Sequence, residues 1–512
     1  MKKDLSVHIV VMTLLALLAI PRELTAQEGQ KSRHQPHHYQ LVDVGTLGGP
    51  QSYIADSGIP GGKFVNNSGI FTDFADTTMP DLFQSFCFNA DCFVSPALRW
   101  RNGSPTPLGA LVQGVSSAPT WISENGLIAG FSQNGELDPL NGFPELRAVL
   151  WESGGVTNLG TLPEGGFESV ANAVNNRRQV VGAALNTIPD PNSLTLTLNF
   201  VYGATQVRAF LWNEESGMQD LGTLGGTDAL GALINDHGQV MGWSYTSLTQ
   251  PGLCFPLAIG SFIWDKENGM RNIGSFGGTC TLAQDLNNRG QIVGYAFPAE
   301  QGNSRAFLWE GGSFRELGGS LGGNSTGAFV VNDAGQAAGF GYLNGDTFFH
   351  ATLWKQIGQI TDLGTIGSDP CSSAKAINMT GQVVGDSISL GNCLTNGDAS
   401  RAFLWEDGAI FDLNALIPPG SPLYLVHPQN INDEGEIAGF GVDASNNQHA
   451  FLLVPCDENH PGVEGCDYSL ADAATQMSSI EPAMGKAPGP LSHSALRRRN
   501  QRSHFATIAP RD

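Results

Sequence analysis

Charged residues, and basic residues above all, are scarce in this chain. Asp, Glu, Lys and Arg make up 14% of its 512 residues, against about 25% in an ordinary globular domain. Lys and Arg number 26 and Asp and Glu number 48, so the net charge is -22. Nucleic-acid binding needs a basic face that neutralises phosphates, and this charge balance argues against it. Hydrophobic residues reach 41%, which excludes an intrinsically disordered acidic chain.

Common catalytic and metal-binding motifs are also missing. The sequence has no His-Glu-x-x-His zinc motif, no phosphate-binding loop, no dinucleotide fingerprint and no Cys-x-x-Cys pair. Gly323–Gly327 matches the bare Gly-x-Ser-x-Gly pattern. That pattern carries a nucleophile only between a strand and a helix, whereas here it lies in a repeated Gly-rich connection. We therefore assign no catalytic residue, no metal ligand and no cofactor.

Long apolar runs are missing except at the beginning of the chain. Val7–Ile20 follows Lys2 and Lys3 and precedes a run of small residues that ends before Gln27. This is the pattern of a secretory signal peptide. The run is short for a membrane span, although an uncleaved anchor is the alternative. We expect a secreted or cell-surface protein with no transmembrane segment in its mature chain.

What the sequence has in abundance is glycine and internal repetition. Gly contributes 65 residues. Three segments recur in a fixed order: a Trp segment such as Arg208–Trp212, a Gly-rich segment such as Asp220–Gly226, and an Asn-turn segment such as Ile234–Gly242. Eight copies of the Trp segment follow one another at an average interval of about 50 residues.

Each repeated segment has the chemistry of short strands joined by tight turns. Short apolar runs are bounded by Gly, Asn and Asp. In the Asn-x-x-Gly pattern, Asn favours the turn and Gly accepts a positive φ. The recurring Asp236, Asp333 and Asp433 are explained by this turn. One unit then holds four strands: one before the Asn turn, one after it, the Trp strand and the Asp-Leu-Gly strand. Such a unit is one blade of a β-propeller.

The ends of the repeat region predict how the fold closes. The region begins on a fourth strand, within Tyr39–Gly49, and ends on a third strand, within His449–Val454. Pairing of these strands would remove the exposed sheet edges. We therefore predict an all-β fold, a β-propeller of about eight four-stranded blades with ring closure between the chain ends. A blade number of seven is the other candidate, because residues 50–95 match the repeat poorly. A β-solenoid is the alternative architecture.

The sequence divides into four parts. We assign residues 1–26 to the signal peptide, 27–38 to a linker, 39–455 to the repeat propeller and 456–512 to a disulfide-containing, mostly disordered tail. The tail carries a basic cluster, Arg497–Arg499, whose role is open.

The repeats resemble the HAF family of extracellular repeats, named for the His-Ala-Phe that begins the Trp strand. That beginning is present at His449, is reduced to His-Ala at His350, and reads Arg-Ala-Phe in three other copies. The resemblance covers about residues 39–455. It implies an exported bacterial protein, secreted or at the cell surface, and brings no established activity to particular residues.

Strand alternation sorts the connections onto two faces. The Asn turns and the turns after Trp are short and share one face. The other face, here called the long-loop face, carries the Gly-rich connections and the long loops 183–206, 244–260, 386–400 and 441–448. Binding residues concentrate on loops held by a rigid scaffold, so we predict that the long-loop face binds the ligand. The alternative is that these loops are insertions without a function.

Eight cysteines in an exported chain favour disulfides over zinc. One pair falls on the long-loop face in adjacent units, another falls there within one unit, and two pairs are close in sequence. The predicted disulfides are Cys87–Cys92, Cys254–Cys280, Cys371–Cys393 and Cys456–Cys466.

One repeat position carries a basic or histidine side chain in six units. A ring of cations in a propeller can bind an anionic sugar or a carboxylate. The alternative is structural, with each side chain bonding the neighbouring Gly-rich connection. The repeated Trp residues have the same two interpretations, packing between blades or stacking on sugars. The six residues of the ring are Arg147, Arg208, Arg305, His350, Arg401 and His449.

Three functions are consistent with this organisation. The preferred one is a secreted or surface β-propeller that acts as a non-catalytic, monomeric binding module for a protein or glycan. An extracellular polysaccharide hydrolase or lyase is the alternative, and clustered carboxylates or a His–Tyr pair in the structure would favour it. A structural envelope protein is the third possibility, and a large exposed apolar patch on the loops would argue against it.

Overall fold

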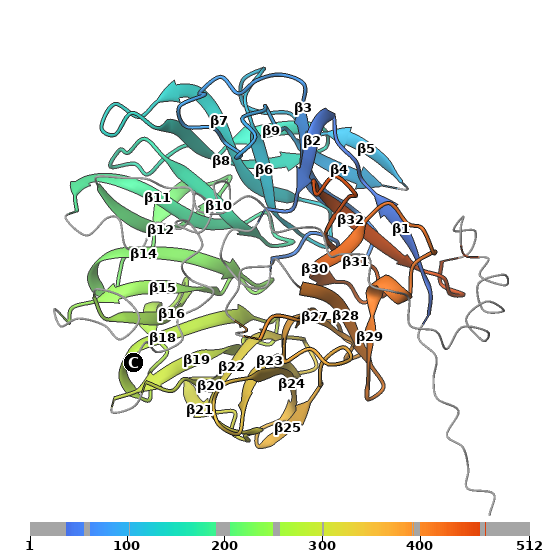
Figure 1. Ribbon diagram of the computed structural model, residues 1–512. Helices are drawn as coiled ribbons and strands as arrows, with labels where there is room; N and C mark the ends of the chain where they lie inside the picture. Colours follow the sequence, from blue (N-terminus) through green and yellow to red (C-terminus); the bar gives the residue numbers. More distant parts are fainter. Residues whose placement is uncertain are drawn as a thin grey trace, which may run out of the picture. The chain divides into compact units, whose positions relative to one another are not determined.

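The apolar runs of the repeats form β-strands, and four strands make one antiparallel unit (Figure 1). Six of the units are separate four-stranded sheets, and a single parallel pairing between Ile259 and Cys280 joins the other two into one eight-stranded sheet. The computed structural model describes residues 37–55, 62–101, 103–190, 205–248, 257–299, 302–391, 393, 400–460 and 466, all within the compact unit Pro36–Asp512. The expected signal peptide and most of the expected tail lie outside them. Within the described residues, no helix has the length and hydrophobicity needed to cross a membrane.

The strands before and after each Asn turn are the first and second strands of a sheet. The first strands are β2 (Gly48–Tyr53), β6 (Ser117–Ile122), β10 (Ser169–Val174), β14 (Gly225–Ile234), β18 (Gly277–Leu286), β22 (Gly322–Val331), β26 (Cys371–Ile377) and β30 (Tyr424–Ile431). The second strands are β3 (Phe71–Thr77), β7 (Ile128–Leu137), β11 (Val180–Pro189), β15 (Val240–Thr246), β19 (Ile292–Pro298), β23 (Ala337–Leu343), β27 (Val383–Ile388) and β31 (Ile437–Val442).

The Trp strand is third and the strand that leads into Leu-Gly is fourth. The third strands are β4 (Ala97–Arg101), β8 (Pro144–Glu152), β12 (Thr205–Asn213), β16 (Ile259–Asp265), β20 (Arg305–Glu310), β24 (Phe349–Gln356), β28 (Ser400–Glu406) and β32 (Gln448–Pro455). The fourth strands are β5 (Ser104–Pro107), β9 (Gly155–Asn158), β13 (Gly217–Asp220), β17 (Gly269–Asn272), β21 (Ser313–Glu316), β25 (Gln359–Asp362), β29 (Ala409–Asp412) and, for the last sheet, β1 (Tyr39–Asp43). A 3-10 helix, Leu413–Ala415, follows β29.

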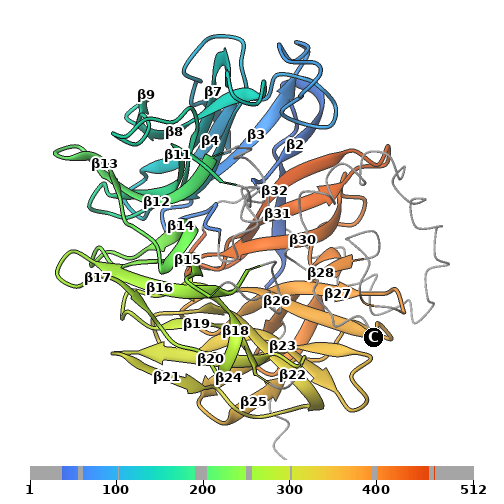
Figure 2. The ribbon, with the colours of Figure 1, turned by 90° about the vertical axis from the view of Figure 1, so that its left-hand side faces the viewer.

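The two ends of the described chain share one sheet. β1 pairs antiparallel with β32, from Tyr39 opposite Pro455 to Asp43 opposite Phe451. Figure 1 shows the blue β1 beside the orange β32. β32 also contacts β2 of the first sheet, and these two strands lie close together in Figure 2 as well. The chain ends therefore pair as the ends of the repeat region predicted.

Side chains of the Asn turns tie each sheet to the next. The Nδ2 atom of Asn175 donates to the carbonyl oxygen of Asn235 at 3.0 Å, and Asn235 donates in the same way to Asn287 at 3.1 Å. In the last sheet, Asn432 Nδ2 donates to the carbonyl oxygen of Asn66 at 2.9 Å, which links it to the first sheet. Buried polar groups need such partners, so the recurrence of Asn reflects contacts between sheets as well as turn formation.

The recurring Asp of the turn also bonds to a neighbouring sheet. Asp236 accepts a hydrogen bond from the backbone N–H of Asn176 at 2.9 Å, and Asp333 accepts one from Asn288 at 2.7 Å. Asp433 accepts one from Met379 at 2.9 Å. The explanation from the turn alone was therefore incomplete, because these bonds join residues that lie far apart in the sequence.

The Trp strands supply much of the apolar core. Trp151 is 1% exposed and Trp354 is fully buried, and the other Trp residues at this position are buried as well. The Phe two residues before Trp is fully buried in several sheets, as at Phe210 and Phe307. This burial supports the packing interpretation of the repeated Trp residues rather than stacking on a sugar.

Residues 50–95, which match the repeat poorly, still contribute to a four-stranded sheet, β2 to β5. The mismatch includes Asp73, which stands where the other second strands have Gly. Asp73 is fully buried, and its Oδ1 atom accepts a hydrogen bond from Trp100 Nε1 at 2.7 Å. Its Oδ2 atom has no hydrogen-bond partner. Burial raises the pKa of Asp73 to about 8, although the hydrogen bond from Trp100 acts to lower it.

Asp73 makes stability depend on pH. The folded chain keeps a proton on Asp73 that the unfolded chain releases above pH 3.8, so stability should fall as the pH rises from 3.8 to about 8. Replacing Asp73→Asn keeps an acceptor for Trp100 and removes the titration. We expect the midpoint of urea unfolding to fall less steeply with pH in this variant than in the wild type. An unchanged slope would show that Asp73 ionises in the folded state as freely as in the unfolded one.

Candidate functional site

Sheet topology places the connections at two opposite ends of the strands. The turns from first to second and from third to fourth strand lie at one end, and the remaining connections lie at the other, which is the long-loop face. The predicted loop bounds were too wide, because backbone pairing extends the strands into them. The loop expected over 441–448 is reduced to residues 443–447 between β31 and β32. Parts of the other long loops, including residues 191–204 and 249–256, lie outside the described residues.

Exposed large hydrophobic side chains gather on the long-loop face. Among the described residues, 14 large hydrophobic side chains are exposed. All but Ile357 and Met379 lie in its connections or at the strand ends beside them. Those on this face are Leu47, Met79, Leu82, Phe86, Val112, Leu137, Leu140, Ile188, Leu248, Phe348, Leu390 and Tyr424. The uneven distribution shows that the two faces have different surface chemistry.

Several of these side chains belong to neighbouring connections of the first two sheets. We call Met79, Leu82, Phe86, Val112 and Leu140 the apolar patch. Leu82 is 62% exposed and Leu140 is 54% exposed. The ring of Phe86 lies 4.5 Å from that of Phe143, between centroids, which joins the loop after β3 to the loop after β7. The sequence does show apolar residues within turn-rich loops at these positions. They do not recur from one repeat unit to the next, so the repeat pattern did not point to them.

Buried carboxylates fix the backbone of the apolar patch. Asp81 is 3% exposed and accepts hydrogen bonds from the backbone N–H groups of Phe83 and Phe88. Asp138 accepts from the backbone N–H of Leu140 at 2.7 Å. A disulfide, Cys87–Cys92, follows Phe86 directly within the same loop. The patch is thus held in place before a partner arrives, which lowers the entropy lost on binding.

A polar network beneath the patch anchors the same loop to the first sheet. The hydroxyl of Tyr53 lies 3.0 Å from Asp91 Oδ2 and 3.3 Å from Asp76 Oδ2. Ser95 Oγ donates to Asp76 Oδ1 at 2.6 Å. The hydroxyl group of Tyr53 can donate its proton to only one of these two carboxylates, so its contact with the other requires a proton on a carboxylate. Burial raises the pKa of Asp76 to about 7, and the neighbouring Asp91 contributes to this rise, so Asp76 is the carboxylate that can hold such a proton near neutral pH.

The ring of basic and histidine side chains is paired with carboxylates within the chain. Arg208 Nε lies 2.8 Å from Asp220 Oδ2, and Asp220 belongs to the adjacent fourth strand of the same sheet. The same cross-strand arrangement pairs His350 with Asp362, and Arg305 with Glu316.

The other members of the ring are paired as well. His449 lies 3.0 Å from Asp43, and the hydrogen bond to Asp43 raises the pKa of His449. Arg401 pairs with Asp369 at 2.6 Å and Arg147 with Glu145 at 2.7 Å. Arg401 also donates to the carbonyl oxygen of Ile366, in the Gly-rich connection, at 3.0 Å. This geometry favours the structural interpretation of the ring over an anion-binding one.

The structure contains three disulfides among its described residues. They join Cys87 to Cys92, Cys371 to Cys393 and Cys456 to Cys466. Cys280 is also disulfide-bonded, whereas Cys254, its expected partner, lies outside the described residues. The disulfides suggest an oxidising, extracellular environment.

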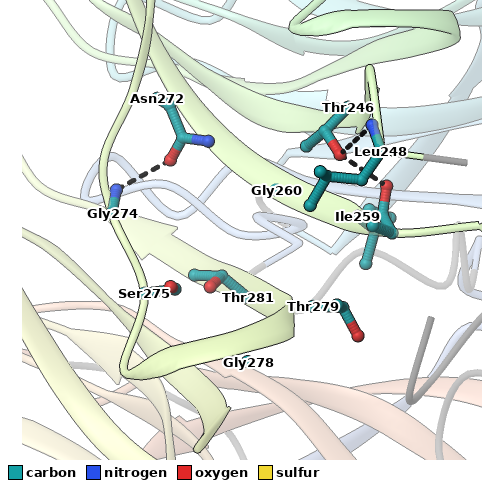
Figure 3. Close-up of a pocket in the computed structure, with 11 residues that line it drawn as sticks. Thr246, Leu248, Ile259, Gly260, Asn272, Gly274, Ser275, Gly278, Thr279 and Thr281 are labelled. Atoms are coloured by element: carbon teal, nitrogen blue, oxygen red, sulfur yellow. Dashed lines mark hydrogen bonds between the residues drawn. The ribbon is translucent and has the colours of Figure 1, made fainter. Parts of the chain in front are cut away.

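A cavity of about 320 Å³ lies on the long-loop face, lined by residues of β15 to β18 and of their connections (Figure 3). Its lining consists of small polar and apolar residues, among them Thr246, Asn272 and Ser275. Two of its polar side chains are already used, since Thr246 Oγ1 accepts from Leu248 N at 3.3 Å and Asn272 Oδ1 accepts from Gly274 N at 2.8 Å. The lining includes no charged residue, His or Tyr.

Metal binding has no support in the part of the chain that the structure describes. No group of three or more His, Cys, Asp or Glu side chains there is arranged to hold an ion.

Comparisons with known proteins show no close relative. No family model and no curated protein matches the chain. Among solved structures, the acylaminoacyl peptidase of Pyrococcus horikoshii is 9% identical with a TM-score of 0.41, and the match covers 75% of this chain and 57% of the peptidase. Dipeptidyl peptidase 4 of Porphyromonas gingivalis is 10% identical with a TM-score of 0.39, with 74% of this chain and 56% of that chain covered.

A third match is the sialidase of Trypanosoma rangeli in complex with the inhibitor DANA. It is 10% identical with a TM-score of 0.30, and the match covers 88% of this chain and 66% of the sialidase. The chain thus spans little more than half the length of the two peptidases and about two thirds of the sialidase. At these scores the similarities carry no argument about activity or ligand.

Proposed function

We propose that this chain is an eight-bladed β-propeller, exported and secreted or held at the cell surface, that acts as a non-catalytic binding module. Its long-loop face binds an extracellular protein or glycan, and the apolar patch favours a protein. The resemblance of the repeats to HAF extracellular repeats and the presence of disulfides support the location.

Contacts between sheets support the propeller. Each four-stranded unit contacts the next along the chain, and the last contacts the first through β32 and β2. The pairing of β1 with β32 and the bond from Asn432 to Asn66 support closure of the ring between the last unit and the first. The first strands from β6 to β30 contact one another in succession, as the innermost strands of a propeller do.

The uneven distribution of exposed hydrophobic side chains carries the binding proposal. Apolar side chains that cluster on one face of a stable scaffold are typical of interaction surfaces. Ordered loops and buried anchoring carboxylates add rigidity where the patch needs it. This surface argues against a purely structural envelope protein. The alternative of a hydrolase or lyase gains no support from the cavity, because the described residues of its lining include no acid or base.

The binding proposal is tested by substituting the patch and an equally apolar control. Double replacement Leu82→Asp with Leu140→Asp places two charges on the patch, whereas Ile357→Asp with Met379→Asp places two charges on the opposite face. Extracellular proteins of the producing cells are passed over each immobilised variant, and retained proteins are quantified by mass spectrometry. We expect a partner that the wild type and the control retain and that the patch variant loses at least about tenfold, as for interface anchors.

Equal retention by both variants would contradict a protein-binding role of the patch. A parallel panel of cell-surface glycans tests the other class of ligand. If the wild type binds a glycan and the patch variant binds it equally well, the glycan site lies on another part of the long-loop face.

A further inference from the structure

One sheet breaks the repeat at a buried position. In each second strand, the residue after the recurrent Gly faces the Ala of the Trp strand or its equivalent. In seven sheets this residue is aromatic or Ala, whereas in β27 it is Asp386, with a side chain 6% exposed. The seven equivalents are Phe74, Phe131, Ala183, Trp243, Tyr295, Phe340 and Phe440. Departures from a structural rule at buried positions are concentrated at functional sites.

Asp386 contacts a lysine and a histidine side chain from neighbouring first strands. His427 Nδ1 on β30 lies 2.8 Å from Asp386 Oδ1, and Lys375 Nζ on β26 lies 3.5 Å from Asp386 Oδ2. Although burial opposes ionisation, the charges of His427 and Lys375 hold the pKa of Asp386 below its usual value. The ring of His427 also packs on Phe440, with centroids 4.8 Å apart. The carboxylate is therefore charged and fixes both partners.

The first strands of the sheets carry very few basic or histidine side chains. Across the eight first strands as the structure describes them, Lys375 is the only Lys or Arg and His427 is the only His. Their strands contact each other. Both side chains reach solvent, at 37% exposed for Lys375 and 16% for His427. Lys375 contacts one carboxylate, which leaves donors of its ammonium group for a ligand.

The geometry defines what the two groups present to a ligand. Because the ionised Asp386 can only accept, Nδ1 of His427 carries the proton of this bond, and Nε2 is left to hydrogen-bond with a hydroxyl group of a ligand. The ammonium group of Lys375 has three donors, of which Asp386 uses one. A carboxylate is the natural partner of the remaining donors.

We propose that Lys375 and His427, positioned by Asp386, bind a hexuronate, with the ligand carboxylate on Lys375 and a ligand hydroxyl on His427 Nε2. The site is distinct from the apolar patch. Its ligand is either a free uronic acid or a uronate residue within a polysaccharide, since both present the same carboxylate and hydroxyl groups.

Titrations with defined sugars test the site. Glucuronate, an oligogalacturonate, glucose and acetate are titrated into the full mature chain by calorimetry, and the imidazole signals of His427 are followed by NMR. We expect a uronate to bind and to shift the His427 signals, with glucose and acetate at least about tenfold weaker because each lacks one of the two groups. Binding of the free sugar would assign a site for a single uronate. Binding of the oligosaccharide alone would assign one for a uronate within a polymer.

Three variants locate the binding. Lys375→Gln and His427→Gln should each weaken uronate binding at least about tenfold. Asp386→Phe installs a residue that the repeat itself uses at this position and should abolish binding while the chain stays folded. Lys355→Gln removes an exposed lysine from β24 and should leave the affinity unchanged.

Two results would overturn the proposal. One is the absence of binding by either uronate, and the other is an equal affinity in the wild type and in Lys375→Gln. Leu82→Asp with Leu140→Asp should not alter uronate binding, so a failure here is separate from a failure of the apolar patch.

Discussion

Replacing Gly242→Ala should lower the free energy of unfolding by about 3 kcal/mol or more, as expected for overpacking against a rigid backbone. A Cβ atom at Gly242 would lie 2.0 Å from the carbonyl oxygen of Leu230 and 2.6 Å from the ring of Phe262. The register shift between Gly231 and Leu233 in the adjacent β14 belongs to a bulge of that strand, and backbone atoms cannot move aside as a flexible side chain can.

The same close approach recurs in the other sheets. At the equivalent glycines the added Cβ would meet a backbone oxygen at distances between 2.0 and 2.3 Å. These glycines are Gly130, Gly182, Gly242, Gly294, Gly339, Gly385 and Gly439. Gly155→Ala in β9 is the matched control, because its Cβ would have no neighbour closer than 3.7 Å. Urea unfolding of both variants measures the difference, and an equal stability of the two would contradict the steric explanation.

Removing the strand that joins the chain ends should destabilise the fold and promote self-association. A chain that begins at residue 45 lacks β1, which pairs with β32 through five residues and contributes the buried side chain of Tyr39. Burial of one large side chain is worth about 1.5–3 kcal/mol, and the loss of the ladder adds to this. The edge of β32 would also become available for pairing with another chain.

A chain that begins at residue 37 is the control for the loss of β1, since it keeps the strand and lacks the preceding residues. We expect the shorter chain to unfold at a lower temperature and to elute as larger species in size-exclusion chromatography. A peptide of residues 37–44 added in excess should restore part of the stability by mass action. Equal stability and a monomeric profile in both chains would show that β1 is dispensable for closure.

Repetition made the secondary structure of this chain predictable. The order of the three segments indicated four strands in each unit, and the structure has them in that order, with the strand before the Asn turn first. The position of the chain ends within a unit indicated the pairing of β1 with β32. The divergent first unit, over residues 50–95, was the weak point, and there Asp73 replaces the recurrent Gly.

Single residues of the candidate sites were less predictable. The apolar patch consists of residues that no repeat relates, such as Leu82 and Phe86, which precede the Cys87–Cys92 disulfide in the loop after β3. Asp386 was part of a recognised repeat, but its importance depends on Lys375 and His427, which lie on two other strands. A pattern along one strand cannot show which side chains meet between neighbouring sheets.

The sequence by itself determined the all-β class, the four strands of each repeated unit and the strands that meet at the chain ends, because these follow from local turn chemistry and from periodicity. Only the tertiary structure decided why particular residues recur. The Asn of the turn bonds to the neighbouring sheet, the second-strand Gly makes room for a carbonyl oxygen, and Arg208 is paired with Asp220 on the adjacent strand. Each of these reasons is a contact between segments separated in the chain, and such contacts exist only after the strands have packed.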